Sequence, residues 1–171
     1  MVTAARILVE ACTMFEDKYA RSLPAYGHER RGAPVFADVM IDEQPIMLSS
    51  FVYDPDCVML FDPSLVGMGI NAGQGVRDHT VLVANAETMR SLPDEVTKLP
   101  WKETYCVNAT TIALEAMGRP ILNSPMLGAL AKTGIVDLES VCQALVTDFG
   151  AIRGESNVTA AREAYNQVRT G

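Results

Sequence analysis

The sequence lacks the residue spacings from which metal centres are built. No Cys-x-x-Cys pair occurs, and the four cysteines stand far apart. Iron–sulfur clusters and structural zinc sites use closely spaced cysteines, so we expect no metal ligands in this chain. Each cysteine lies in an apolar stretch, which is typical of buried, reduced thiols in a cytoplasmic protein; the four are Cys12, Cys57, Cys106 and Cys142.

Histidine, long apolar runs and positive charge are also scarce. His28 and His79 are the only histidines, and neither has an evident serine or cysteine partner in the sequence. The carboxylates fall at predicted helix caps and on helix surfaces, so a paired general acid and base is unsupported. No apolar run approaches the roughly 18 residues of a membrane span, and the net charge of −7 argues against nucleic-acid binding. We therefore expect no catalytic residue here and place the chemistry in other chains.

What the sequence has is an alternation of short apolar runs and helical patterns. Val58–Phe61, Val81–Ala84 and Thr104–Val107 have the length of buried strands. Strands that alternate with helices predict an α/β fold, with a mostly parallel sheet covered by helices on both faces. At 171 residues the chain has the length of one domain, residues 1–171, with a helical part from about 124 to 171.

The first fifty residues add a helix and a hairpin to this pattern. Val2–Phe15 has the apolar spacing of a helix, and Lys18–Leu23 is a short candidate strand that Pro24–Gly27 ends. Val35–Ile41 predicts a further strand, and Ile46–Leu48 could return beside it as the partner of an antiparallel hairpin.

Caps and stops define the predicted helices of the second half. Asn108 is a candidate N-cap for a helix that ends before Gly118, and Gly150 is a candidate stop. Helices are predicted over Ser124–Thr133, Asp137–Phe149 and Gly154–Arg169. Small residues along one side of the first of these allow close packing, either on the domain's own sheet or on another subunit.

Two loops could bind an anion. Residues 71–75, Asn-Ala-Gly-Gln-Gly, resemble half of a phosphate loop but precede a strand, so we interpret them as a plain loop. The stretch between Gly27 and Gly32 is more unusual because it carries two adjacent arginines, Arg30 and Arg31, in an acidic protein. Guanidinium groups bind phosphate or carboxylate through paired hydrogen bonds. The alternative is an ion pair within the loop or between subunits.

Three stretches together resemble the gamma subunit, or gamma domain, of pyruvate and related 2-oxoacid:ferredoxin oxidoreductases. They are Ser22–Val35, which contains Glu-Arg-Arg-Gly-Ala-Pro, then Phe61–Leu65, and then Gly118–Leu130. The resemblance runs from about Val2 to Phe149, and the arginine loop is similar to the pyruvate-type branch of the family.

The resemblance implies a Rossmann-like fold and a role as one subunit of a complex of anaerobic metabolism. Such enzymes decarboxylate a 2-oxoacid oxidatively on thiamine diphosphate, pass electrons through clusters to ferredoxin or another acceptor, and release an acyl-CoA. It implies that thiamine diphosphate and Mg²⁺ lie between alpha- and beta-type subunits and [4Fe-4S] clusters in beta- and delta-type subunits, so that this chain alone binds no cofactor. It makes one loop the candidate contact with coenzyme A or with a neighbouring subunit: His28, Glu29, Arg30, Arg31 and Gly32.

One departure from the family concerns the first strand. Family members usually begin with a strand and a Gly-x-Gly-Gly-Gln-Gly turn directly before the helix that starts here at Val2, after Met1. We expect that strand to be truncated, lost, or supplied by another chain, and we expect the sheet to offer unpaired backbone to a partner. The competing hypothesis is a stand-alone Rossmann-like module that binds acyl-CoA or a nucleotide. The incomplete glycine pattern counts against it, and more strongly against an ordinary dehydrogenase.

Overall fold

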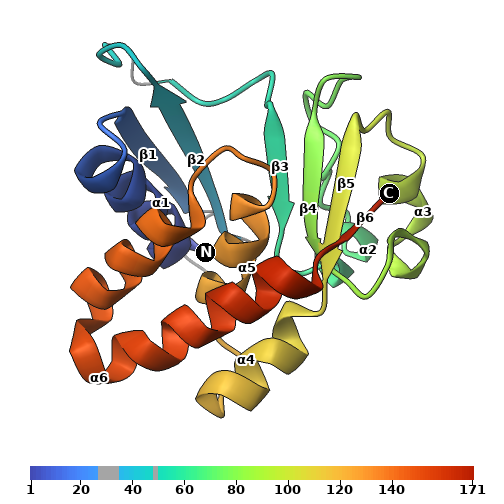
Figure 1. The fold of residues 1–171 in the computed structure, drawn as a ribbon. Helices are drawn as coiled ribbons and strands as arrows, with labels where there is room; N and C mark the ends of the chain where they lie inside the picture. The colour runs from blue at the N-terminus through green and yellow to red at the C-terminus, as the bar shows by residue number, and fades with distance from the viewer. Residues whose placement is uncertain (27–34, 48–49) are drawn as a thin grey trace.

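A parallel sheet forms the centre of the chain, as the apolar runs predict. The computed structural model describes residues 1–26, 35–47 and 50–171. Strands β3 (Cys57–Leu60), β4 (Val81–Asn85) and β5 (Glu103–Val107) lie parallel to one another in that order. A two-residue strand, β6 (Arg169–Thr170), adds to β5 in the antiparallel direction. The predicted mostly parallel α/β sheet is therefore confirmed (Figure 1).

A second sheet contains only two antiparallel strands. β1 (Tyr19–Tyr26) pairs with β2 (Val35–Asp42) along its whole length, from Tyr19 opposite Asp42 to Tyr26 opposite Val35. The antiparallel hairpin is thus present, but β2 pairs with β1 rather than with the predicted partner at Ile46–Leu48, of which Ile46 and Met47 form no strand and Leu48 lies outside the described residues. Residues 43–47 form no strand.

The predicted end of β1 at Pro24 is also wrong. Pro24 lies inside the strand, opposite Ala37. In the described part of the chain, β1 pairs with no strand other than β2. An edge strand accepts a proline wherever its missing N–H would not have pointed at the neighbouring strand.

Helices cover one face of both sheets and, on the other side, the second face of the parallel sheet (Figure 1). One face carries α1 (Val2–Phe15), α4 (Ala109–Met117), α5 (Asn123–Ala131) and α6 (Leu138–Gln167). The other face carries three single turns, which are α2 (Ser64–Gly67), the 3-10 helix η1 (Met89–Ser91) and α3 (Asp94–Thr97). Leu92 and Val96 of this second face pack on Leu82 of the sheet.

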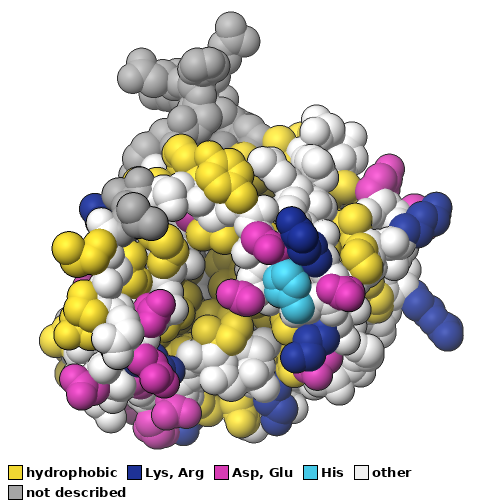
Figure 2. Space-filling view, turned by 90° about the horizontal axis from the view of Figure 1, so that it is seen from above, with side chains coloured by type: hydrophobic (Ala, Val, Ile, Leu, Met, Phe, Trp, Pro, Cys, Tyr) yellow, Lys and Arg dark blue, Asp and Glu magenta, His cyan; other side chains and the backbone are white. Residues whose placement is uncertain are grey.

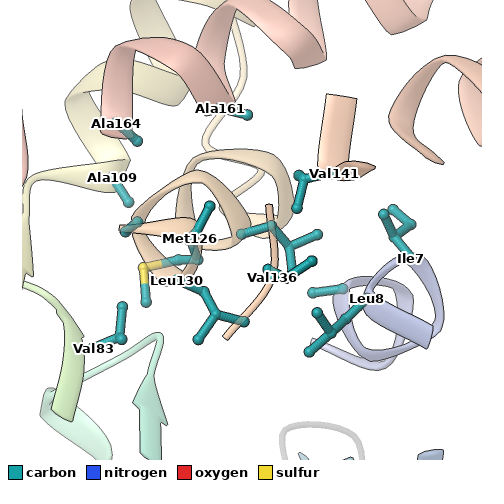
Figure 3. Close-up of a cluster of buried hydrophobic side chains, with 14 of the residues drawn as sticks. Ile7, Leu8, Val83, Ala109, Met126, Leu130, Val136, Val141, Ala161 and Ala164 are labelled. Atoms are coloured by element: carbon teal, nitrogen blue, oxygen red, sulfur yellow. The ribbon is translucent and has the colours of Figure 1, made fainter. Parts of the chain in front are cut away.

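The helix α5 lies at the centre of the larger core. Figure 3 shows Met126 and Leu130 on α5, with Val83 of the sheet on one side and Ala161 and Ala164 of α6 on another. All residues from Ser124 to Ala131 are buried, which explains why this helix has no polar face.

Gly128 sets the distance between α5 and α6. A Cβ atom placed on Gly128 would lie 2.0 Å from the carbonyl oxygen of Ala161. Beside this contact, the buried Ser124 hydroxyl donates a hydrogen bond to Asn157 Oδ1 at 2.6 Å. The small residues of α5 therefore serve packing inside the domain, mainly against α6 rather than against the sheet or another subunit.

The predicted caps and stops largely hold. Asn108 Oδ1 accepts a hydrogen bond from the Thr111 N–H at 3.1 Å, and Gly118 ends α4 with φ +67°. Gly150, with φ +74°, interrupts α6 where the predicted helix ends. Asp137 precedes α6 as predicted, although its carboxylate makes no cap and its own N–H donates to Glu16 Oε1 at 2.7 Å.

Candidate functional site

The arginine loop is the site that the sequence predicts, and it lies outside the described residues. His28, Glu29, Arg30, Arg31 and Gly32 all fall within residues 27–34. The hairpin that carries them is described up to its last pair, Tyr26 opposite Val35. Two acidic residues near the hairpin are described: the Asp38 carboxylate accepts the Val52 N–H at 2.9 Å, and Glu43 is exposed. Both interpretations of the loop therefore stay predictions.

The carboxyl edge of the parallel sheet is where open α/β folds usually bind ligands. Here the side chain of Asn85, the last residue of β4, connects the end of β3 to the start of α4. Its Nδ2 donates to the Phe61 carbonyl oxygen and to Thr110 Oγ1, both at 3.0 Å, and its Oδ1 accepts the Thr110 N–H at 3.3 Å. Asp62 Oδ1 accepts the N–H of Ser64 at 3.0 Å. These polar groups bind one another, so this edge is a structural junction.

The glycine loop before β4 is a turn, in agreement with its interpretation as a plain loop. The Gly73 N–H donates to Asn71 Oδ1 at 3.0 Å. Gly75 has φ +75°, and a Cβ there would lie 2.1 Å from the Tyr53 carbonyl oxygen. Glycine is required at this position because a side chain would collide with neighbouring backbone.

Titratable side chains outside the arginine loop do not assemble into a catalytic or metal-binding group. Across residues 1–26, 35–47 and 50–171, no three His, Cys, Asp or Glu side chains converge on one point. One charged cluster that includes a histidine is exposed: Asp54 Oδ1 lies 3.1 Å from Arg77 Nε and 3.4 Å from His79 Nε2. It ties the segment before β3 to the turn before β4 and has no nucleophile beside it.

A groove separates the two sheets. It has a volume of about 810 Å³ and lies between β2 and β3, with α1 and α5 beneath it. Its walls are mainly apolar, and the residues that set this character are Ala4, Leu8, Val39, Ile41, Met59 and Leu130. Figure 2 looks onto one end of the molecule, where the surface is hollowed between hydrophobic side chains. The only charged side chains that line the groove within the described chain are those of Asp42 and Asp56.

Cys57 also lines the groove. Burial raises the pKa of its thiol to about 12, and the neighbouring Asp56 adds to the shift. Because a buried thiolate is poorly solvated, the thiol stays protonated at neutral pH. Cys12, Cys106 and Cys142 are buried while Cys57 is partly exposed, and all four are free thiols, as predicted.

The fold and these sites define a class of protein: a Rossmann-like α/β domain whose sheet is interrupted by an apolar groove. The chain belongs to the pyruvate ferredoxin/flavodoxin oxidoreductase family, whose profile it matches over residues 1–167. The predicted resemblance is therefore confirmed.

Relatives in this family are named as subunits. The common subunit gamma of the pyruvate/ketoisovalerate oxidoreductases of Pyrococcus furiosus is 44% identical over 168 residues, which cover 98% of this chain and 90% of the relative. The pyruvate synthase subunit PorC of Methanocaldococcus jannaschii is 40% identical over 168 residues, which cover 98% of this chain and 89% of the relative.

Solved structures agree with the fold. The crystal structure of pyruvate oxidoreductase subunit PORC from Thermotoga maritima superposes with a TM-score of 0.81 at 30% identity and covers 99% of this chain and 90% of that one. A keto/oxoacid ferredoxin oxidoreductase gamma subunit from Geobacter sulfurreducens shares the fold at a TM-score of 0.74 and 22% identity, over 97% of this chain and 89% of that one. Within the part of the chain that the structure describes, no helix is both long and apolar enough to cross a membrane.

Proposed function

We propose that this chain is the gamma-type subunit of a 2-oxoacid oxidoreductase complex that oxidises pyruvate or a similar 2-oxoacid to an acyl-CoA. The observation that carries the proposal is the 44% identity to a gamma subunit over 98% of the chain. The chain then contributes to an active site that other subunits complete.

The cofactors and partners follow from this role. Thiamine diphosphate and Mg²⁺ would lie between alpha- and beta-type subunits, and [4Fe-4S] clusters would lie in beta- and delta-type subunits. The complex would pass electrons to ferredoxin or another acceptor in the cytoplasm.

The arginine loop is the proposed point of contact with coenzyme A or with a neighbouring subunit. His28, Glu29, Arg30, Arg31 and Gly32 carry this proposal from the sequence alone. Coenzyme A is rich in phosphate, and guanidinium groups bind phosphate through paired, charge-assisted hydrogen bonds. An acidic surface on another subunit would satisfy the same two arginines.

Purification under mild conditions tests the subunit role. The chain is expressed alone and together with the candidate partner subunits, and each preparation is assayed for pyruvate-dependent reduction of ferredoxin or of a viologen dye. We expect a stable complex with turnover in the second preparation and no turnover in the first. A chain that turns over a 2-oxoacid by itself would overturn the proposal.

A further inference from the structure

The start of α6 has a cap that its own sequence does not supply. Asp137 precedes the helix, but its side chain makes no capping hydrogen bond. Instead the Asp137 N–H donates to Glu16 Oε1 at 2.7 Å, and Glu16 directly follows α1, 121 positions earlier in the chain. In a capping box this N–H is bound by a glutamate at the third position of the same helix, which is Ser140 here. Glu16 therefore provides from the end of α1 what the sequence of α6 lacks.

Lys18, just before β1, completes the contact. Its Nζ lies 2.6 Å from Glu16 Oε2 and donates to the Ile135 carbonyl oxygen at 3.4 Å. The Glu16 side chain is only 6% exposed, so the carboxylate is shielded from the water and salt that weaken ion pairs at the surface. Together the two side chains, which we call the clip, join the turn between α1 and β1 to the connection between α5 and α6.

The turn between these two side chains has an unusual backbone. Asp17 has φ +54° and is the only non-glycine residue with a positive φ in the described part of the chain. Left-handed backbone is unfavourable for residues with a Cβ atom, although aspartate adopts it more readily than most. The Lys18 N–H donates to the Cys12 carbonyl oxygen at 3.1 Å, which closes the end of α1. This closed turn carries both side chains of the clip.

The clip depends on the negative charge of Glu16. Burial pushes the pKa of the Glu16 carboxyl group up, but hydrogen bonds from Lys18 and from the Asp137 N–H outweigh burial, and the pKa lies below its ordinary value. A carboxyl group whose pKa is lowered by folding stabilises the fold above its ordinary pKa and loses this effect as the pH falls. The stabilisation by Glu16 is therefore present at neutral pH and lost in acid, below about pH 4.

Two other titratable groups face the clip within the described residues. Burial, together with the charge of Glu16, raises the pKa of Cys12 on α1 to about 11, so this thiol is uncharged at neutral and acidic pH. The pKa of Lys18 is raised mainly by its hydrogen bond to Glu16 and in small part by the charge of Asp137 at the start of α6. Asp137 is thus the second carboxyl group whose effect an experiment must separate from that of Glu16.

We propose that Glu16 and Lys18 form an acid-sensitive clip that fixes the start of α6 to the end of α1. The ionised carboxylate binds Lys18 and the Asp137 N–H and so holds the first turn of α6 in place. When Glu16 takes up a proton it gives up the ion pair, and this turn separates from α1 before the rest of the domain unfolds. Local opening of this kind is common at helix ends that few contacts hold. The device lies within this chain and does not depend on the proposed function.

Amide hydrogen exchange of the full chain, followed by NMR, tests the clip. The informative amides are those at position 137, which binds Glu16, and at Val141, which donates to the Asp137 carbonyl oxygen at 3.1 Å. Glu16→Gln keeps the shape of the side chain and removes its charge. At about pH 7 we expect exchange at both amides, corrected for the intrinsic rate, to be about tenfold faster in Glu16→Gln than in the natural chain. At about pH 3 the two proteins should exchange at the same rate, while the Val83 amide of β4 stays protected.

Two variants serve as controls. Asp137→Asn removes the other carboxyl group, and it should leave both the exchange rates and their pH dependence unchanged because that side chain makes no cap. Asp94→Asn removes an exposed pair in which Asp94 Oδ2 lies 2.7 Å from Lys98 Nζ, and it should also change nothing at position 137. Equal exchange in Glu16→Gln and the natural chain at about pH 7 would overturn the clip. Acid opening that disappears in Asp137→Asn would overturn it as well, and this comparison holds even if Glu16→Gln does not fold.

Discussion

The contact between α5 and α6 makes Gly128→Ala the sharpest test of the packing. The new Cβ would lie 2.0 Å from the Ala161 carbonyl oxygen, 2.6 Å from its carbonyl carbon and 2.7 Å from its Cα. An ordinary carbon–oxygen contact is about 3.3 Å, so the two helices must separate by more than about 1 Å. All three colliding atoms are backbone, so no side-chain rotation can relieve the collision.

The magnitude follows from two opposing effects. Overpacking of a dense core costs about 1–3 kcal/mol and sometimes more, and a clash with backbone belongs at the upper end of that range. Alanine gains about 1 kcal/mol over glycine within a helix. We therefore expect Gly128→Ala to lower the free energy of unfolding by about 2 kcal/mol, which is a large fraction of the stability of an ordinary domain.

Urea denaturation, followed by far-ultraviolet circular dichroism, measures this loss. Gly67→Ala is the matched control, because a Cβ at Gly67 meets nothing within 4 Å and its φ is not positive. That control should leave stability unchanged or raise it by up to about 1 kcal/mol. If Gly128→Ala were as stable as the control, the close approach of α5 and α6 would be refuted.

Three further predictions concern the junction, the groove and the loop. Asn85→Ala should destabilise the chain by about 1–3 kcal/mol, because it removes two donated hydrogen bonds and leaves the Thr110 N–H without its acceptor. Thermal unfolding of Asn85→Ala and of Thr110→Val should show comparable losses of stability. An unchanged melting temperature would contradict the structural junction at Asn85. Burial raises the pKa of Cys57 to about 12, so its alkylation rate in the free chain should rise about tenfold per pH unit from pH 7 to 10 without a plateau; a plateau near pH 8.5 would indicate a solvated thiol. Arg31→Ala should raise the KM for coenzyme A in the assembled complex by about 10- to 150-fold if the loop binds its phosphates, whereas unchanged coenzyme A kinetics with weaker assembly would favour the interface interpretation.

Local signals in the sequence predicted the central sheet and the ends of several helices. The apolar run at Val81–Ala84 became β4, and Asn108, Gly118 and Gly150 mark helix boundaries as expected. These features depend on few neighbouring residues, since a cap needs one side chain and a stop needs one glycine with positive φ. Such information is present in a short stretch of chain.

Long-range pairing could not be predicted in the same way. The apolar pattern of Val35–Ile41 predicts a strand but does not say which strand lies beside it, and the partner proved to be β1 rather than residues 46–48. Strand β6 has two exposed residues and therefore carries no pattern at all. The direction in which Gly128 faces was also open, because small residues suit packing on a sheet, on a helix or on another subunit.

The candidate site also has one part that the sequence predicts and one part that only the structure shows. Arg30 and Arg31 stand out in the sequence because paired arginines are unusual in an acidic chain, and their role stays a prediction. The groove has no sequence motif, because it arises where β2 and β3 fail to pair. The expectation of unpaired backbone at the sheet agrees with these two edges, but only the structure shows that they face each other across an apolar space.

The subunit role is tested most directly by native mass spectrometry of the chain purified from its own cells, combined with an assay of the same fractions. We predict that the chain elutes with other subunits that carry thiamine diphosphate and iron–sulfur clusters, and that pyruvate-dependent dye reduction follows those fractions alone. A free monomer or homodimer of this chain, with the oxidoreductase activity in fractions that lack it, would contradict the account.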